Sequence, residues 1–185
     1  MLSIDAYKEI YTILDSAGPL SYDCGRLCDS VCCNDSSFDG EESYIYLLPG
    51  EKEYLDAVGS NITVERQKRA EHDLPRSWGE YVFIARCPGK KSCDRSIRPV
   101  QCRTFPLYPY ITDKGVLEMT LCYMDLPYSC PFVEGRETVS ADFSRATLKA
   151  WNMLIEDAAI RDLVILDSKE FIKGANKHES DIGNR

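Results

Sequence analysis

The sequence predicts a single small α+β domain over residues 1–185, with a short antiparallel sheet, helices at both ends of the chain and an irregular, cysteine-rich middle. Apolar residues recur at helical spacing near both ends, and short apolar runs of strand length lie between them. The nine cysteines begin only at residue 24, and most lie in polar segments. A length of 185 residues fits one domain and suffices to bury an ordinary core.

The N-terminal third is predicted to hold a helix, a strand and a second, shorter helix. Apolar side chains recur every three or four residues over residues 3–16, and a Gly-Pro pair then ends the helix. Residues 44–48 have the composition of a strand, and a Pro-Gly turn leads into a short helix over residues 51–58. Residues 60–80 are polar, and we interpret them as connecting structure.

The middle of the chain is predicted to contain a strand, an irregular segment and a hairpin. Residues 81–85 form an apolar run of strand length. Residues 87–109 hold three cysteines and four prolines, so little regular helix is expected there. Residues 107–111 and 116–123 flank a Thr-Asp-Lys-Gly turn, which predicts a β-hairpin.

The C-terminal part is predicted to be helical over about residues 141–173. Ser140 is a suitable N-cap for a helix over about residues 141–157, which has a broad apolar face. Residues 158–173 are expected to continue as a second or kinked helix. Residues 174–185 have the composition of a frayed tail.

Charge and hydropathy favour a cytoplasmic protein. The chain carries 22 basic and 30 acidic residues, a net charge of −8, which disfavours nucleic acid as a partner. The first residues lack the basic start and apolar stretch of a signal peptide, and no apolar run approaches the roughly 20 residues of a membrane span. We therefore expect no membrane and no nucleic-acid partner. A protein partner or substrate stays open.

The strongest functional feature is a group of four cysteines that we call the cysteine box: Cys24, Cys28, Cys32 and Cys33. In a reducing cytosol, such cysteines are more often metal ligands or redox groups than structural disulfides. Three-residue spacers let one helical face point successive thiolates at one centre. Adjacent Cys32 and Cys33 are not expected to point comfortably at the same centre. Either one of them ligates the metal while the other lies next to the ligands, or the two serve two centres.

Further cysteines follow in two groups. Cys87, Cys93 and Cys102 lie in the proline-rich middle, so the candidate metal ligands are Cys24, Cys28, Cys32, Cys33, Cys87, Cys93 and Cys102. Cys122 and Cys130 come later. They fit a second centre, a pair of core thiols or a redox pair, and the sequence leaves these alternatives open.

The donor set predicts a sulfur-ligated metal. Four thiolates are a common ligand set for Zn²⁺, and a [4Fe–4S] cluster needs four as well. The chain has only two histidines, and its cysteines exceed the needs of one zinc site. An iron–sulfur cluster, with [4Fe–4S] favoured, is therefore the first candidate and Zn²⁺ the second. We then expect this metal to hold the irregular, metal-tied middle of the chain in place through its cysteines.

Basic residues accompany the second cysteine group. Four thiolates around Zn²⁺ or around a [4Fe–4S]²⁺ core leave a net charge of −2, which Arg98 and Arg103, on either side of Cys102, are placed to offset. We take these two arginines as candidate cofactor-binding residues. Lys90, Lys91 and Arg95 are expected to lie in solvent.

The cysteines and their neighbours resemble a known family. Cys24-Gly25-x2-Cys28-x3-Cys32-Cys33, then Cys87 and Cys93, then Arg98-Pro99-x2-Cys102-Arg103-x-Phe105-Pro106, are similar to the family of zinc- or iron-chelating cysteine-cluster domains. The resemblance covers about residues 20–110, and the spacers of the first box are longer than in the common form. It implies metal binding through these cysteines. The family also includes proteins similar to flagellin lysine N-methylase, so the resemblance implies a cluster-dependent enzyme as an alternative.

The function expected from the sequence is therefore a metal-binding cysteine-cluster protein. One alternative is a cluster-dependent enzyme, methyl-transferring or redox. Another is a zinc-stapled interaction module without chemistry. The chain has no GxGxxG, P-loop or HExxH motif, so no catalytic residues can be named and the enzyme question stays open.

Overall fold

The computed structural model describes the backbone of residues 1–33, 44–86 and 95–182, and the side chains of these ranges up to residue 169 together with residue 171. The helices are α1 (Ile4–Asp15), α2 (Gly25–Cys28), α3 (Glu51–Ala57), α4 (Val100–Thr104), α5 (Ala141–Leu154) and α6 (Ala158–Ile182). The strands are β1 (Tyr44–Tyr46), β2 (Val64–Lys68), β3 (Tyr81–Arg86), β4 (Leu107–Ile111) and β5 (Leu117–Leu121). Short 3₁₀ turns lie at Val31–Cys33, Arg69–Glu71, Arg76–Trp78 and Arg95–Ile97.

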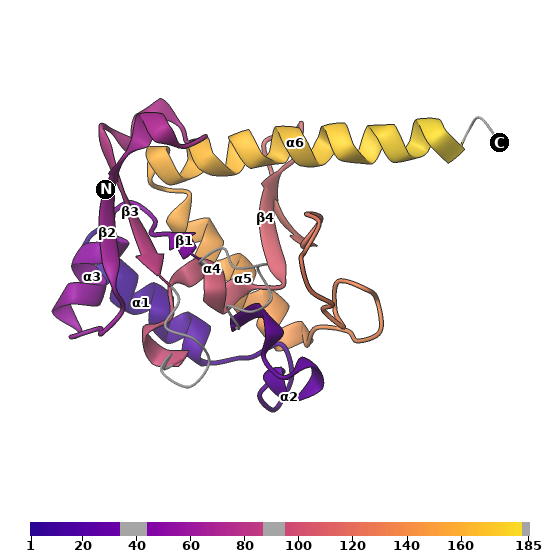
Figure 1. The fold of residues 1–185 in the computed structure, drawn as a ribbon, viewed down its shortest axis with the longest axis horizontal. Helices are drawn as coiled ribbons and strands as arrows, with labels where there is room; N and C mark the ends of the chain where they lie inside the picture. The colour runs from indigo at the N-terminus through magenta and orange to yellow at the C-terminus, as the bar shows by residue number, and fades with distance from the viewer. Residues whose placement is uncertain (34–43, 87–94, 183–185) are drawn as a thin grey trace.

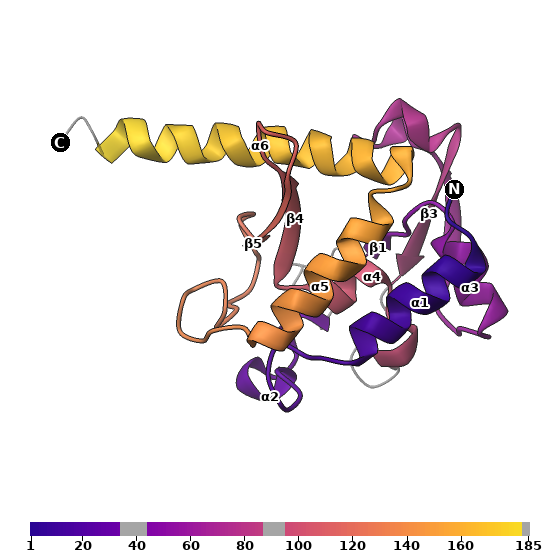
Figure 2. The ribbon, with the colours of Figure 1, turned by 180° about the vertical axis from the view of Figure 1, so that it is seen from behind.

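These elements form the predicted α+β architecture around α5. Helix α5 packs against α1 on one side and against the β4–β5 hairpin on the other. Helix α3 and a three-stranded sheet lie beyond α1, and α6 crosses the hairpin at β4 (Figures 1 and 2). Past the hairpin, α6 runs away from the body of the molecule (Figure 1). No helix in the described part of the chain is long and apolar enough to span a membrane.

The two amphipathic helices supply much of the core. Ser3 and Ser140 act as N-caps of α1 and α5, because each hydroxyl accepts a hydrogen bond from the backbone N–H three residues later. The buried face of α1 then meets that of α5, which confirms the helical spacing read from both segments. The buried side chains are Tyr7, Ile10, Tyr11 and Leu14 of α1 and Phe143, Ala146, Thr147, Ala150, Trp151 and Leu154 of α5.

The three-stranded sheet has the antiparallel order β1–β3–β2, with β3 in the centre. Strand β2 lies in the segment predicted to be connecting structure, so that prediction was wrong. Its sequence, Val-Glu-Arg-Gln-Lys, carries a single apolar residue. It is held by its pairing with β3 and by a bidentate ion pair at 3.0 Å, in which Arg86 donates to both oxygens of Glu65.

The described part of the proline-rich segment contains little regular helix, as predicted. Its α-helix, α4, has five residues and follows Pro99 at the N-cap position, where a missing N–H leaves no intrahelical hydrogen bond unmade. One helical prediction needs correction. Helix α6 continues to Ile182, beyond the predicted end at residue 173. The remaining predicted elements are confirmed, with bounds that differ by a few residues.

A buried carboxylate ties α3 to α1 and α4. Glu51 has no exposed surface, and its carboxylate accepts hydrogen bonds from the Tyr11 hydroxyl at 2.8 Å, the Leu48 N–H at 2.9 Å and the Val100 N–H at 2.6 Å. Burial raises the pKa of Glu51, and these hydrogen bonds and the charge of Arg103 oppose the rise. This network fixes where α4 begins, and through α4 it positions the residues that follow.

The predicted Pro-Gly turn before α3 requires its glycine. Gly50 has a φ of 92°, in the left-handed region. A Cβ atom there would lie 2.7 Å from the carbonyl oxygen of Leu2 and 3.1 Å from the ring of Tyr7. The turn therefore lets the N-terminal segment pack directly over the start of α3.

Helix α6 docks on the hairpin through polar and aromatic contacts. The Ser168 hydroxyl accepts a hydrogen bond from the Ile111 N–H at 2.8 Å, and the Tyr123 hydroxyl donates to the carbonyl oxygen of Asp167 at 3.1 Å. The ring of Phe171 lies 4.8 Å from that of Tyr123 and 5.0 Å from that of Tyr110, measured between centroids. The hairpin and α6 therefore form one packed layer.

Replacing Asp167 in this layer by asparagine is expected to stabilise the protein at neutral pH. Burial, and after it the charge of Asp73, raise the pKa of Asp167 to about 6. Because this folded-state pKa lies above the unfolded value, the charged carboxylate penalises the folded state above about pH 6. Asp167→Asn should raise the free energy of unfolding by about 1–2 kcal/mol at pH 7, with the gain shrinking between about pH 6 and pH 4. Urea unfolding at several pH values measures this.

A matched control is Asp162→Asn, which changes an exposed carboxylate on the same helix. Its effect on the unfolding free energy should stay within about 0.5 kcal/mol at every pH. An Asp167→Asn gain of the same size at pH 4 and pH 7 would show that the carboxylate's charge is not its cause.

Candidate metal centre

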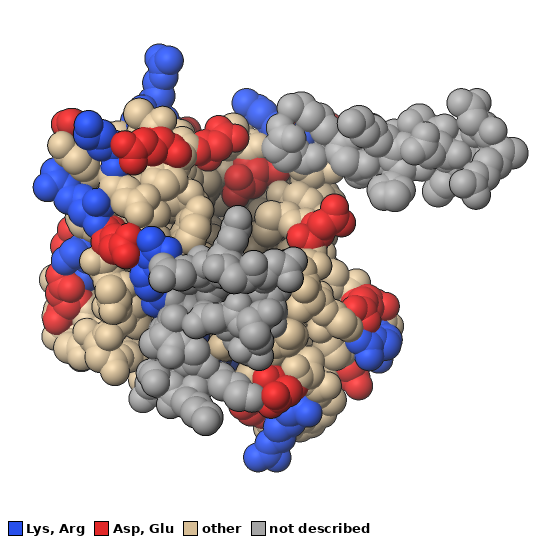
Figure 3. Space-filling view, viewed as in Figure 1, with Lys and Arg blue, Asp and Glu red and all other residues tan. Residues whose placement is uncertain are grey.

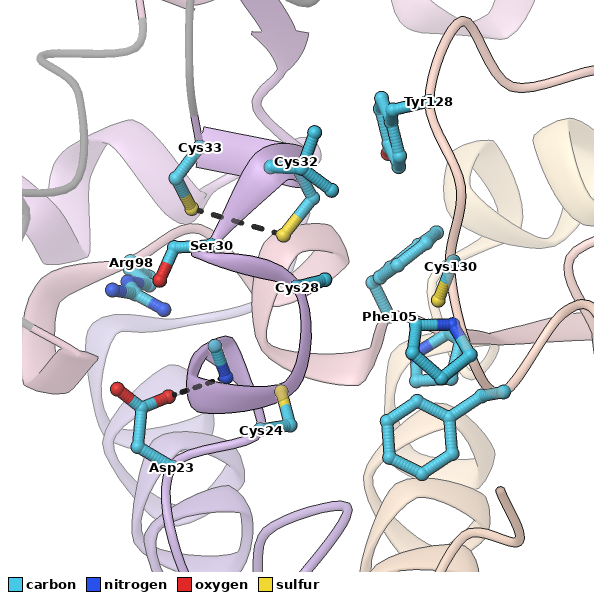
Figure 4. Close-up of a pocket in the computed structure, with 15 residues that line it drawn as sticks. Asp23, Cys24, Cys28, Ser30, Cys32, Cys33, Arg98, Phe105, Tyr128 and Cys130 are labelled. Carbon is cyan, nitrogen blue, oxygen red and sulfur yellow. Dashed lines mark hydrogen bonds between the residues drawn. The ribbon is translucent and has the colours of Figure 1, made fainter. Parts of the chain in front are cut away.

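The cysteine box lines a cavity with a second segment far away in sequence. One wall, from residues 23–33, brings together Asp23, Cys24, Gly25, Cys28, Ser30, Val31, Cys32 and Cys33. The other brings together Phe105, Pro106, Tyr128, Cys130, Pro131 and Phe132. Arg98 also lines it (Figure 4). The cavity is therefore rich in sulfur, with thiols on both walls.

A tight local fold presents the box to the cavity. Helix α2 is a single turn, so Cys24 and Cys28 lie four residues apart on the same side of it. The chain then reverses through Asp29 and Ser30, whose φ values of 54° and 56° are left-handed. Two consecutive non-glycine residues in this region are strained, and such strain gathers at functional sites.

Gly25 is the residue that permits this reversal. Its N–H donates to the Asp23 carboxylate at 3.0 Å, and its carbonyl accepts from the Ser30 N–H at 2.9 Å. A Cβ atom at this position would lie 2.2 Å from the Ser30 hydroxyl oxygen. A side chain at position 25 would therefore require the Ser30 side chain to move away from its position in this turn.

The adjacent cysteines lie closer together than the sequence suggested. The sulfurs of Cys32 and Cys33 are 4.0 Å apart and share a hydrogen bond (Figure 4). In a tetrahedral zinc site with Zn–S bonds of about 2.3 Å, neighbouring sulfurs are about 3.8 Å apart. The separation of the pair thus matches that of two ligands of one centre. Within the described ranges, however, no group of three or more His, Cys, Asp or Glu side chains is already arranged to hold an ion.

The thiols of Cys24, Cys32 and Cys33 differ in their electrostatic surroundings. Burial, and after it the charge of Asp23, raise the pKa of Cys24. The hydrogen bond with Cys32, and after it the positive charge of Arg98, lower the pKa of Cys33 to about 6, while the same hydrogen bond raises that of Cys32. The pair therefore shares one negative charge beside Arg98, which suits an incoming cation.

The second group of predicted site residues is spread over several places. Cys87 and Cys93 lie outside the described residues, as do Lys90 and Lys91. Cys102 is exposed on α4 and does not line the cavity. Arg98, by contrast, lines the cavity. A group that offsets the charge of the thiolates has to lie there.

Arg103 has a different environment from Arg98. Its side chain is fully buried, stacks on the Tyr11 ring and forms an ion pair with Asp15, both on α1. It also donates to the carbonyl oxygen of Ser96 at 3.1 Å. Arg103 thus ties α4 to α1, and it is not among the residues that line the cavity. Arg95 is exposed, as expected, although it donates to the carbonyl oxygen of Ala17 at 3.2 Å.

The sequence-based ligand set left out the facing wall. Cys130 is buried and lines the cavity together with Tyr128 and Phe132. Cys122 is also buried, yet it does not line the cavity. The signal in the sequence was a Cys-Pro pair shortly before a helix N-cap, but nothing in its spacing connected it to residues about 100 positions earlier.

The size and the lining residues of the cavity suit a thiophilic metal better than an organic molecule. Its volume of about 40 Å³ is far below the roughly 300–1,000 Å³ of a typical pocket for a small molecule. Its donors are sulfur atoms, which select zinc and iron–sulfur clusters. The residues present therefore fit a compact sulfur-ligated centre in donor chemistry and in size.

Comparison of the chain with protein-family models, with curated proteins and with solved structures finds no match. What the site binds is therefore inferred from its own residues. On the face shown in Figure 3, basic and acidic side chains alternate over the described residues. That part of the surface offers no single-sign patch of the kind that phosphate backbones require.

Proposed function

We propose that this protein holds a metal centre through thiolates of the cysteine box, with an iron–sulfur cluster as its first candidate occupant and Zn²⁺ as its second. A bound cluster would supply one-electron chemistry, whereas zinc would supply only a cross-link. The observation that carries the proposal is that all four box cysteines line one small cavity. Cys24 is the N-cap residue of α2, Cys28 is its last residue, and Cys32 and Cys33 come from the turn that follows.

The surroundings of the cavity support a held metal over a catalytic one. Phe105, Pro106 and Phe132 give the facing wall an apolar lining that excludes water from bound sulfur. Arg98 supplies a positive charge beside Cys33. The small volume leaves little room for an organic substrate next to the metal.

Elemental analysis and absorbance of protein purified without oxygen test the proposal. A [4Fe–4S] cluster gives a brown protein with about four iron and four sulfide per chain, and zinc gives a colourless one with about one zinc per chain. The double variant Cys24→Ser/Cys28→Ser should lose the metal. Cys102→Ser should keep it, because Cys102 does not line the cavity. A metal-free wild-type protein, or a double variant with a full complement, would refute the proposal.

A further inference from the structure

We infer that Cys130 ligates the same metal as the cysteine box, from the opposite wall of the cavity, so that the metal cross-links residues 24–33 to the segment just before α5. This inference rests on the proposed function and adds to it a ligand that the sequence did not assign. It makes the centre a tertiary one, shared by two segments about 100 residues apart.

The first support is the position of Cys130. Its side chain is 6% exposed, and it is the described cysteine on the wall that faces the box (Figure 4). Cys24, Cys28, Cys32 and Cys33 line the same cavity from the other wall. The facing wall therefore adds a fifth thiol to the cavity that the box lines.

The second support is that the facing wall is held in place independently of any metal. At one end, the Cys122 N–H donates to the carbonyl oxygen of Pro106 at 2.8 Å. After Cys130, the Glu134 N–H donates to the Cys130 carbonyl oxygen at 3.0 Å, which closes a turn. Cys130 thus sits on an ordered segment between the hairpin and α5.

The two walls are also joined to each other near the cavity. The Ser140 N–H donates to the carbonyl oxygen of Pro19 at 2.8 Å, and its hydroxyl donates to that of Gly18 at 3.0 Å. Residues 18–19 lie only a few positions before Cys24. The start of α5 and the start of the box segment are therefore fixed relative to each other, which preorganises Cys130 opposite the box.

The third support comes from ligand number. A closed sulfur site has four thiolates around the metal. The cavity offers five cysteines for these four positions, four from the box and Cys130 from the facing wall. A metal that lies between the two walls takes Cys130 as one ligand and needs only three from the box. The remaining box cysteine stays next to the centre as a non-ligating thiol.

Cobalt(II) titration of metal-free full-length protein under anaerobic conditions tests this inference, because the thiolate-to-cobalt absorption grows with the number of thiolates. Cys130→Ser should weaken cobalt binding at least about tenfold, because the ligand on the facing wall is lost. The absorbance per cobalt should fall by about a quarter where no other thiolate takes the vacant position, and stay near the wild-type value where the spare box cysteine does. Cys122→Ser is the matched control, since Cys122 is similarly buried but does not line the cavity. It should behave as wild type.

The outcomes separate this inference from the proposed function. If wild-type protein takes up no metal, the proposed function fails. If wild type binds cobalt and Cys130→Ser matches Cys122→Ser in absorbance and affinity, the inference alone is overturned.

A measurement on the wild-type protein covers the case in which Cys130→Ser does not fold. Alkylation before and after chelation, read by mass spectrometry, should show Cys24 and Cys130 becoming reactive together while Cys122 stays unchanged. Exposure of Cys24 without a change at Cys130 would contradict the shared centre.

Discussion

Replacing Glu51 by alanine is expected to lower the free energy of unfolding by about 3–5 kcal/mol, which is a large part of the stability of an ordinary domain. The substitution removes the acceptor for three donors, the Tyr11 hydroxyl and the N–H groups of Leu48 and Val100, all of which are left in the interior. It also removes a buried negative charge that interacts with the guanidinium of Arg103. Urea unfolding at pH 7 measures the loss as a shift in midpoint.

Glu53→Ala is the matched control for this prediction. Glu53 lies two residues further along α3, and its side chain is exposed. Its replacement should change the unfolding free energy by no more than about 0.5 kcal/mol. Equal effects of the two substitutions would show that the buried hydrogen bonds of Glu51 contribute little.

If the proposed metal is bound, its removal should loosen both walls of the cavity while the helical core stays folded. Structural zinc sites contribute about 10–16 kcal/mol of apparent binding free energy in zinc-finger peptides. The main hydrophobic cluster, built around α1 and α5, contains none of the box cysteines. Amide hydrogen exchange in residues 24–33 and 128–132 should therefore accelerate more than about 100-fold on chelation. Such an acceleration corresponds to a loss of only about 2.7 kcal/mol in the free energy of local opening. Exchange in α1 and α5 should change far less.

Restoring the metal provides the control for chelation, because protection should return in both segments together. Unchanged exchange in residues 24–33 would contradict a metal held by the box. Simultaneous loss of protection in α1 would contradict the separation of core and metal centre.

The fold was predictable from sequence where one local signal dominated. Helices α1 and α5 combine an N-cap serine with an apolar face, and the β4–β5 hairpin combines apolar strands with a Gly-containing turn. Strand β2 was missed because its five residues are nearly all polar, and only the pairing with β3 makes them a strand. That pairing is a tertiary fact without a local signal.

The candidate site divides in the same way. The box was visible because its four cysteines lie within ten residues. Cys130 carried no such signal, since it reaches the cavity only through the packing of the hairpin and α5. Arg103 shows the opposite difficulty. Its place beside Cys102 suggested a partner for the metal, but the fold turns its side chain into the interior against Tyr11 and Asp15. Proximity in the sequence therefore pointed to the cysteines of one wall, but it did not reveal the direction of the Arg103 side chain.

The pairing of α1 with α5 sets an order of events during synthesis. About 125 residues separate the end of α1 from the start of α5. At roughly 5–20 residues per second, the ribosome needs about 6–25 s to make them. For that time the apolar face of α1 has no α5 to cover it, and the cysteine box waits almost as long for the segment that carries Cys130. The apolar face of α1 therefore lacks its main helical partner, and the box lacks its facing wall, until the last third of the chain is being made.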